Sequence, residues 1–257
     1  MPFPHTRDQP SPPAPYEPVG ADIPKLHGAE ITAVYYGQRQ AGDFYDFIRV
    51  HPERVLFGLL DVAGGLEDTR TILSHAQNTF RTVGASLFAT DDVNESDAMV
   101  ELCLQLNRTV LEAAQGVHAC PAFGGCYNES LGVVCYFNAG HIPGLVRDAV
   151  GTSELPATGL PLGLFSHATC DAPMVALAPS AALLLASRGV IEGKRHGDEF
   201  GFDRLKEIFR RSRGMMAKEI CVSVLDGVRQ FMETAPTHDD VTALALVREP
   251  STSADPV

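Results

Sequence analysis

The sequence lacks any apolar segment long enough to cross a membrane as a helix. Its longest apolar stretch, VALAPSAALLLASRGV at 175–190, is interrupted by proline, serine and arginine, and it is shorter than the ~20 residues that a bilayer requires. The N-terminal segment contains no apolar core of the kind that a signal peptide needs. We therefore expect no membrane association and a cytoplasmic location.

The chain also lacks an excess of positive charge. It has 20 Lys and Arg residues against 32 Asp and Glu residues, which gives a formal net charge of −12. Nucleic acids and anionic membrane surfaces attract basic proteins, so this balance disfavours both as partners. It is consistent with local binding of cations or with an ordinary acidic protein.

No C-x-x-C pair occurs among the six cysteines. Cys120 and Cys126 lie near His118, but no second close pair completes the four ligands of a zinc site. In a protein without an export signal, we expect reduced thiols with structural or incidental roles. The six are Cys103, Cys120, Cys126, Cys135, Cys170 and Cys221.

The chain of 257 residues, 45% hydrophobic and 20% charged, is long enough to bury the core of one large domain. Prolines are concentrated at the N-terminus and block regular hydrogen bonding, so we expect residues 1–25 to form a disordered tail. Residues 249–257 have a similar composition and are expected to be flexible. One domain over 26–248 remains.

Residue patterns predict an α+β fold. β-branched and aromatic segments indicate strands, and apolar residues at three- and four-residue intervals indicate helices. Short turns between successive strands favour antiparallel pairing, so we expect two packed, mainly antiparallel sheets flanked by helices. Asn94 or Ser96 is the expected N-cap of the second helix. In chain order we expect strands at 31–40, 42–50 and 54–62, helices at 68–88 and 94–115, strands at 122–130, 131–140, 144–149 and 174–187, helices at 202–212 and 217–234, and a last strand within 237–249.

Three aspartates share a local context. Asp43, Asp61 and Asp239 each lie at the end of an apolar strand, beside a glycine or a turn. Strand ends that meet at one edge of a sandwich bring such carboxylates together, and clustered carboxylates take up protons or bind a hard divalent cation. The alternative is that each aspartate caps its own turn.

Eight motifs occur along the chain in this order: AGDFYDF, LLDVAGG, LNRTVL, FNAGHIPGLV, TGLPLGLF, SRGVIEG, DEFGFDRL and THDDVTALALV. Together they resemble the stage II sporulation protein E (SpoIIE)/RsbU branch of the PPM family of metal-dependent protein serine/threonine phosphatases. The resemblance covers roughly residues 33–247 and implies an αββα sandwich with a two-metal site at one edge.

The resemblance implies specific metal ligands. Asp43 matches an aspartate near the second metal, Asp61 matches the aspartate that bridges both metals, and the carbonyl of Val62 matches the adjacent backbone ligand. Asp239 matches the aspartate that closes the first metal position. The implied cofactor is one or two Mg²⁺ or Mn²⁺ ions, which lower the pKa of a water that attacks the phosphorus of a phosphoserine or phosphothreonine.

Further residues are expected to support these ligands. Asp46 and Asp240 are expected to direct hydrogen bonds toward them, and His238 is a weaker candidate for a proton donor. His141, in NAGH, is expected to cap the turn that follows its strand.

One departure from the family pattern concerns charge. The family usually has T-D-G where this sequence has SRG, so Arg188 stands where a metal-binding aspartate is expected. A guanidinium cannot bind a cation, but it can pair with Asp61 or Asp239. At ~4 Å and an effective dielectric constant of ~20, such a pair interacts by about 4 kcal/mol before desolvation. Glu67 or Asp68 can supply the missing oxygen, and Arg188 can instead bind the substrate phosphate.

Two functions follow. The first is a metal-dependent phosphatase of reduced activity, which acts on a phosphoprotein such as an anti-sigma-factor antagonist in a partner-switching system. The alternative is an inactive pseudo-phosphatase that binds a signalling partner without hydrolysis. The two helices between Asp68 and Gln115 are a candidate homodimer face.

Overall fold

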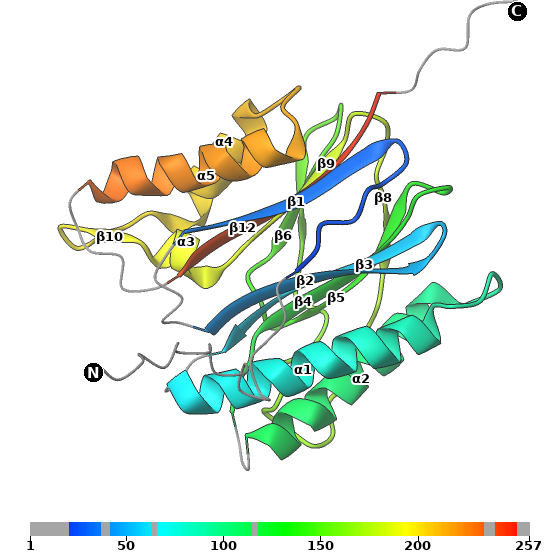
Figure 1. The fold of residues 1–257 in the computed structure, drawn as a ribbon. Helices are drawn as coiled ribbons and strands as arrows, with labels where there is room; N and C mark the ends of the chain where they lie inside the picture. The colour runs from blue at the N-terminus through cyan, green and yellow to red at the C-terminus, as the bar shows by residue number, and fades with distance from the viewer. Residues whose placement is uncertain (1–20, 37–41, 63–65, 115–117, 234–239, 251–257) are drawn as a thin grey trace, which may run out of the picture.

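Two five-stranded antiparallel sheets pack face to face in the computed structural model (Figure 1), which describes residues 21–36, 42–62, 66–114, 118–233 and 240–250. The first sheet has the strand order β1-β12-β9-β6-β7 and the second β2-β3-β4-β5-β8. The first sheet consists of β1 (Ala29–Tyr36), β12 (Val241–Arg248), β9 (Ala182–Ala186), β6 (Gly144–Arg147) and β7 (Thr152–Leu155), and the second of β2 (Gly42–His51), β3 (Arg54–Val62), β4 (Ala122–Asn128), β5 (Val133–Ala139) and β8 (Met174–Ala176).

Helices cover the outer face of each sheet (Figure 1). The second sheet is covered by α1 (Leu66–Leu87) and α2 (Glu95–Ala113), and the first by α4 (Gly201–Arg211) and α5 (Ala217–Met232). A short helix, α3 (Arg188–Glu192), follows β9 directly, and a small hairpin, β10 (Lys194–Arg195) and β11 (Asp198–Glu199), leads into α4. The four layers are the αββα arrangement expected from the sequence.

The core consists of three apolar clusters, one between each pair of layers. Strand side chains alternate between the two faces of a sheet, so Phe57 and Leu59 of β3 pack between the sheets while Leu56 and Leu60 face α1 and α2. In β12 the same alternation sends Leu244 to the space between the sheets. This alternation also determines on which face of its sheet each polar side chain at a strand end lies.

Two consecutive glycines allow β4 to be packed tightly on both faces. A Cβ atom on Gly125 would lie 2.4 Å from the ring of Phe57, and one on Gly124 would lie 2.4 Å from the ring of Phe137. Phe57 belongs to the cluster between the sheets and Phe137 to the cluster under the helices. Residues without a side chain are therefore required at both positions.

The sequence predicted this order of elements well, and the prediction of two antiparallel sheets flanked by helices is confirmed. Asn94 is the N-cap of α2, and its side chain accepts hydrogen bonds from the backbone of Ser96 and Asp97. Three features differ from the expectation. The segment 174–187 is divided into β8 and β9, which lie in different sheets, β1 pairs with β12 at the far end of the chain, and α3, β7 and the β10–β11 hairpin were not predicted.

The last five residues of the expected tail, 21–25, lie in the described part of the chain. Ala21, within the segment 1–25, packs with Leu26 against the cluster between the sheets. None of the described helices combines the length and apolar character needed to span a bilayer.

Candidate functional site

Asp43 and Asp61 face each other at one end of the sandwich. They are directly paired in the register of β2 and β3, and the alternation of both strands turns their side chains toward the first sheet. Thr242 of β12 reaches across and donates a hydrogen bond from Oγ1 to Asp43 Oδ2 at 2.9 Å. Ser187, the residue after β9, makes a second side-chain hydrogen bond to Asp43. Hydroxyl groups of one sheet thus orient a carboxylate of the other.

Burial raises the pKa of Asp43 to about 7. The hydrogen bonds from Ser187 and Thr242 act in the opposite direction, while the negative charges of Asp61 and Asp240 add to the increase. Burial in a low-dielectric environment and a nearby like charge both disfavour the ionised form. The pair is therefore a place where a cation would stabilise the charged carboxylates.

Arg188 already places one positive charge beside this pair. Its Nε lies 3.6 Å from Asp61 Oδ2 and 3.4 Å from Glu192 Oε1. The Arg188 side chain is 47% exposed and that of Asp61 is 13% exposed, so the guanidinium reaches the carboxylate from the solvent side. Of the two pairings considered from the sequence, the one with Asp61 is present, and Asp239 lies outside the described residues.

Ser187 connects Arg188 to the framework of the first sheet. Its Oγ accepts a hydrogen bond from the backbone N–H of Thr242 at 3.0 Å. Nearby, the buried Asp240 accepts a hydrogen bond from the hydroxyl of Tyr35 at 2.7 Å. These contacts tie β1, β9 and β12 together beside Asp43. Thr242, Ser187 and Tyr35 were not among the predicted site residues, although the alternation of β12 places Thr242 on the same face as Leu244.

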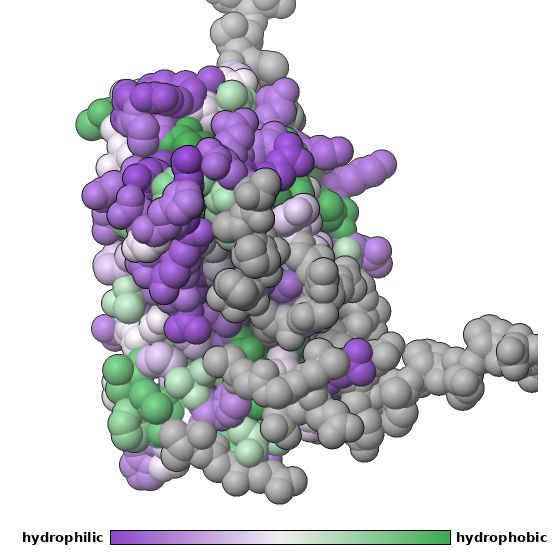
Figure 2. All heavy atoms as spheres, turned by 90° about the vertical axis from the view of Figure 1, so that its left-hand side faces the viewer, coloured by the Kyte–Doolittle hydropathy of each residue, from purple (hydrophilic) through white to green (hydrophobic). Residues whose placement is uncertain are grey.

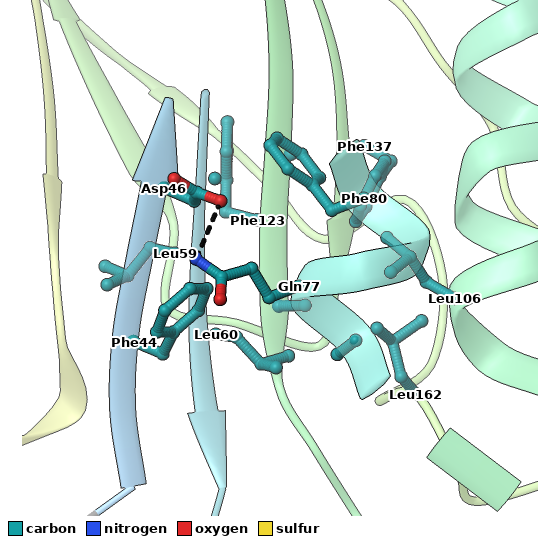
Figure 3. Close-up of a pocket in the computed structure, with 14 residues that line it drawn as sticks. Phe44, Asp46, Leu59, Leu60, Gln77, Phe80, Leu106, Phe123, Phe137 and Leu162 are labelled. Carbon is teal, nitrogen blue, oxygen red and sulfur yellow. Dashed lines mark hydrogen bonds between the residues drawn. The ribbon is translucent and has the colours of Figure 1, made fainter. Parts of the chain in front are cut away.

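Asp46, which we expected beside these carboxylates, lies on the opposite face of β2. It is 2% exposed and accepts two hydrogen bonds from Arg81 of α1, from Nε at 2.7 Å and from an Nη atom at 2.9 Å. Gln77 donates a third from Nε2 at 3.1 Å (Figure 3). Asp46 therefore attaches α1 to the second sheet and does not touch Asp43.

A small cavity lies next to this attachment. It has a volume of about 40 Å³ and lies between α1, α2 and the second sheet (Figure 3). Apart from Asp46 and Gln77 at one edge, its lining is apolar. The side chains around it include Phe44, Leu60, Phe80, Leu106, Phe137 and Leu162.

His141 lies close to Arg188, in the turn that carries the chain from β5 to β6. Its burial lowers its pKa to about 4, and the charge of Arg188 contributes to this decrease. The ring Nδ1 lies 3.1 Å from the carbonyl oxygen of Ile142, which makes Nδ1 the protonated nitrogen. The turn itself is held by Asn138, whose Oδ1 accepts a hydrogen bond from the His141 backbone at 2.8 Å. The expected cap is thus supplied mainly by Asn138.

Two of the predicted metal ligands, Asp43 and Asp61, lie opposite each other in the described part of the chain. Asp43, Asp61 and the carbonyl of Val62 provide oxygen atoms of the type that Mg²⁺ and Mn²⁺ prefer. Within the described ranges, no group of three or more histidine, cysteine or acidic side chains is placed to hold a metal. Arg188 stands where another carboxylate was expected. The predicted residues Asp239 and His238, and the side chains of Glu67 and Asp68, lie outside the described part of the chain.

Figure 2 shows the face of the molecule that is on the left in Figure 1. Hydrophilic side chains predominate in the upper part of this face, and a group of apolar side chains lies at the lower left.

A family model described as Stage II sporulation protein E (SpoIIE) matches residues 51–249. Among solved structures, the RsbU and RsbW domains of a Mycobacterium tuberculosis protein are similar with a TM-score of 0.71 and 21% identity, over 88% of this chain and 62% of that chain. The PP2C phosphatase domain of SpoIIE from Bacillus subtilis, with a fragment of its regulatory domain, is similar with a TM-score of 0.69 and 15% identity, over 87% of this chain and 64% of that chain. RsbX in complex with magnesium is similar with a TM-score of 0.62 and 12% identity, over 88% of this chain and 98% of that chain.

These similarities establish the fold. The chain spans less than two thirds of the first two of these structures. No curated protein matches the sequence.

Proposed function

The chain belongs to the stage II sporulation protein E (SpoIIE) family, and from this premise we propose that it is a protein serine/threonine phosphatase of the PP2C type that acts in signalling. The observation that carries the proposal is the pair of facing carboxylates, Asp43 and Asp61, at the edge of a PP2C-like sandwich. Residues 26–248 are the proposed phosphatase domain.

In this proposal Asp43, Asp61 and the carbonyl of Val62 hold one Mg²⁺ or Mn²⁺ ion, and Asp239 contributes to a neighbouring position. When bound, the metal supplies a water molecule of lowered pKa as the nucleophile for a phosphoserine or phosphothreonine. Thr242 and Ser187 fix the orientation of Asp43 before any ligand arrives. Such preorganisation lowers the cost of bringing the reacting groups together.

Arg188 distinguishes this site from the family pattern. Its contact with Asp61 competes with a cation for the same carboxylate, so we propose weak metal binding and reduced activity. The exposed half of the side chain leaves its remaining N–H groups available to a phosphate, which guanidinium groups bind by paired hydrogen bonds. Arg188 then takes over part of the charge neutralisation that a second metal would provide.

The same contact favours the second candidate, a pseudo-phosphatase. Asp61 has a positive partner without any metal, so the fold can be stable with a site that only binds a phosphorylated protein. A partner-switching regulator is the proposed partner in both cases. The support for it is a similar structure that contains RsbU and RsbW domains in one protein.

One experiment separates the two functions. The purified protein is titrated with Mn²⁺ by calorimetry and assayed for phosphate release from a phosphoserine peptide, alongside Asp61→Asn and the matched control Asp92→Asn in an exposed turn. A phosphatase releases phosphate with Mn²⁺, and only Asp61→Asn loses the release. Peptide binding without release supports the pseudo-phosphatase. The absence of metal binding, peptide binding and release would exclude both.

A further inference from the structure

Two cysteines from distant parts of the chain meet beneath the surface. Cys103 lies in α2, and Cys170 lies in the segment 156–173 between β7 and β8, which we call the 156–173 loop. Their side chains interact with each other, and Cys170 packs against the cluster that contains Cys103 while its Sγ also lies 3.5 Å from the carbonyl oxygen of Asp171. Both belong to the apolar cluster under α1 and α2, where Cys103 is 3% exposed and Cys170 is partly exposed. The two side chains therefore lie close together, and the residue that carries one of them, Cys170, is partly exposed to solvent.

Hydrogen bonds on both sides hold this contact in place. Toward the start of α2, Ser96 Oγ donates to the carbonyl of Ala172 at 2.9 Å. Toward its end, the side chain of Asn107 accepts from the backbone N–H of Gly163 and donates to the carbonyl of Phe165, both at 2.9 Å. The 156–173 loop thus follows α2 with Cys103 and Cys170 between two anchored points. The thiols need no rearrangement of the chain to stay together.

The two thiols have different reactivity. The hydrogen bond from Cys103 and one from Thr158 lower the pKa of Cys170, while the hydrogen bond to Cys170 and burial raise the pKa of Cys103. A thiolate is the reactive form of cysteine. Cys170 is accordingly the sulfur that meets an oxidant first, and Cys103 is placed to react with it next.

The other cysteines lack this combination. Cys126 and Cys135 face each other across β4 and β5, but both have 0% exposure. Cys120 and Cys221 are also fully buried, and burial raises the pKa of each to about 12. Of the six cysteines, all within the described residues, Cys170 is the one that is not buried.

We propose that Cys103 and Cys170 are a site of reversible oxidation, at which a peroxide converts the two thiols to a disulfide that fastens the 156–173 loop to α2. The Cys170 thiolate attacks one peroxide oxygen, the O–O bond breaks, and the departing hydroxide takes up a proton to become water, leaving a sulfenic acid. The sulfur of Cys103 then attacks the Cys170 sulfur, the S–O bond breaks, and a second water leaves. The two thiols lose two electrons, which the peroxide gains. This step is independent of the phosphatase proposal.

The test uses the folded, full-length protein treated with hydrogen peroxide, followed by alkylation of the remaining thiols. Before alkylation, the intact mass should fall by about 2 Da, and titration in denaturant should find about four thiols where the reduced protein has six. Digestion without reductant should yield one linked pair of peptides that contain Cys103 and Cys170. Dithiothreitol should restore the starting state, and the oxidised protein should unfold several degrees higher than the reduced protein.

Variants identify the sulfurs. After peroxide treatment, Cys170→Ser should retain all of its remaining thiols in the reduced form. Cys103→Ser should instead trap Cys170 as a sulfenic acid that reacts with dimedone. Cys221→Ser is the matched control, because it removes a buried thiol from another layer, and it should form the same disulfide as the unmodified protein. Linkage of Cys126 to Cys135, or retention of six thiols by the folded protein, would overturn the proposal. Peptide mapping of the unmodified protein decides this even if a variant fails to fold.

Discussion

Replacement of Arg188 by glutamine removes the positive charge that lies 3.6 Å from Asp61. Two unit charges at that distance attract each other by about 5 kcal/mol at an effective dielectric constant of ~20, and by about 1 kcal/mol in bulk water. The Arg188 side chain is 47% exposed, so solvent screening brings the interaction to ~1–2 kcal/mol. A cation that binds Asp61 must displace this partner, and it also experiences the repulsion of the guanidinium.

A free-energy difference of 1.4 kcal/mol corresponds to a factor of ten in affinity. We therefore expect Arg188→Gln to bind Mn²⁺ ~10-fold more tightly in a calorimetric titration, and Arg188→Asp to bind it more tightly still. Arg210→Gln is the control, because it removes the same charge from the exposed face of α4. An unchanged or weaker affinity in Arg188→Gln would refute this electrostatic reasoning. If the affinity rises while phosphate release falls, Arg188 acts on the phosphate itself.

Three further predictions concern stability. Burial lowers the pKa of His141 from its ordinary value near 6.5 to about 4, so the stability that its neutral ring contributes is lost as the pH falls through this interval. Urea unfolding should show that His141→Asn loses ~2 kcal/mol less than the unmodified protein between pH 7 and pH 5; equal losses would contradict the assignment. Arg54→Met leaves the buried Glu95 carboxylate without the partner that now donates at 2.7 Å, and chemical denaturation should reveal a loss of ~3–5 kcal/mol, which a small effect would disprove. Gly125→Ala places a methyl group against the ring of Phe57, and a decrease of ~1–3 kcal/mol in unfolding free energy is expected; a gain would mean that the ring can move aside.

The sequence predicts most of the fold because its elements are defined by local patterns. Alternating apolar residues mark the strands on either side of the Pro52 turn, and the N-cap Asn94 marks the start of α2. Local sequence patterns do not indicate the pairing partner of β1, because that partner, β12, lies at the other end of the chain. The helix α3 has five residues, too few for a helical period to be recognised.

The candidate site was only partly predictable for related reasons. The order of the motifs indicated Asp43 and Asp61, and the strand register places them side by side. Asp46 is three residues from Asp43, an odd separation that turns its side chain to the other face of the strand. Strand alternation alone would have placed it against α1. The contact between Cys103 and Cys170 depends on how the 156–173 loop follows α2, which no local pattern reveals.

The cavity between α1 and the second sheet has a mechanical consequence. A void of about 40 Å³ corresponds to roughly 24 mL/mol, within the range by which unfolding typically shrinks a protein. Hydrostatic pressure favours the state of smaller total volume, and water that enters the cavity beneath α1 fills the volume that the cavity occupies. Compression should therefore admit water at the contact that Asp46 makes between α1 and the second sheet.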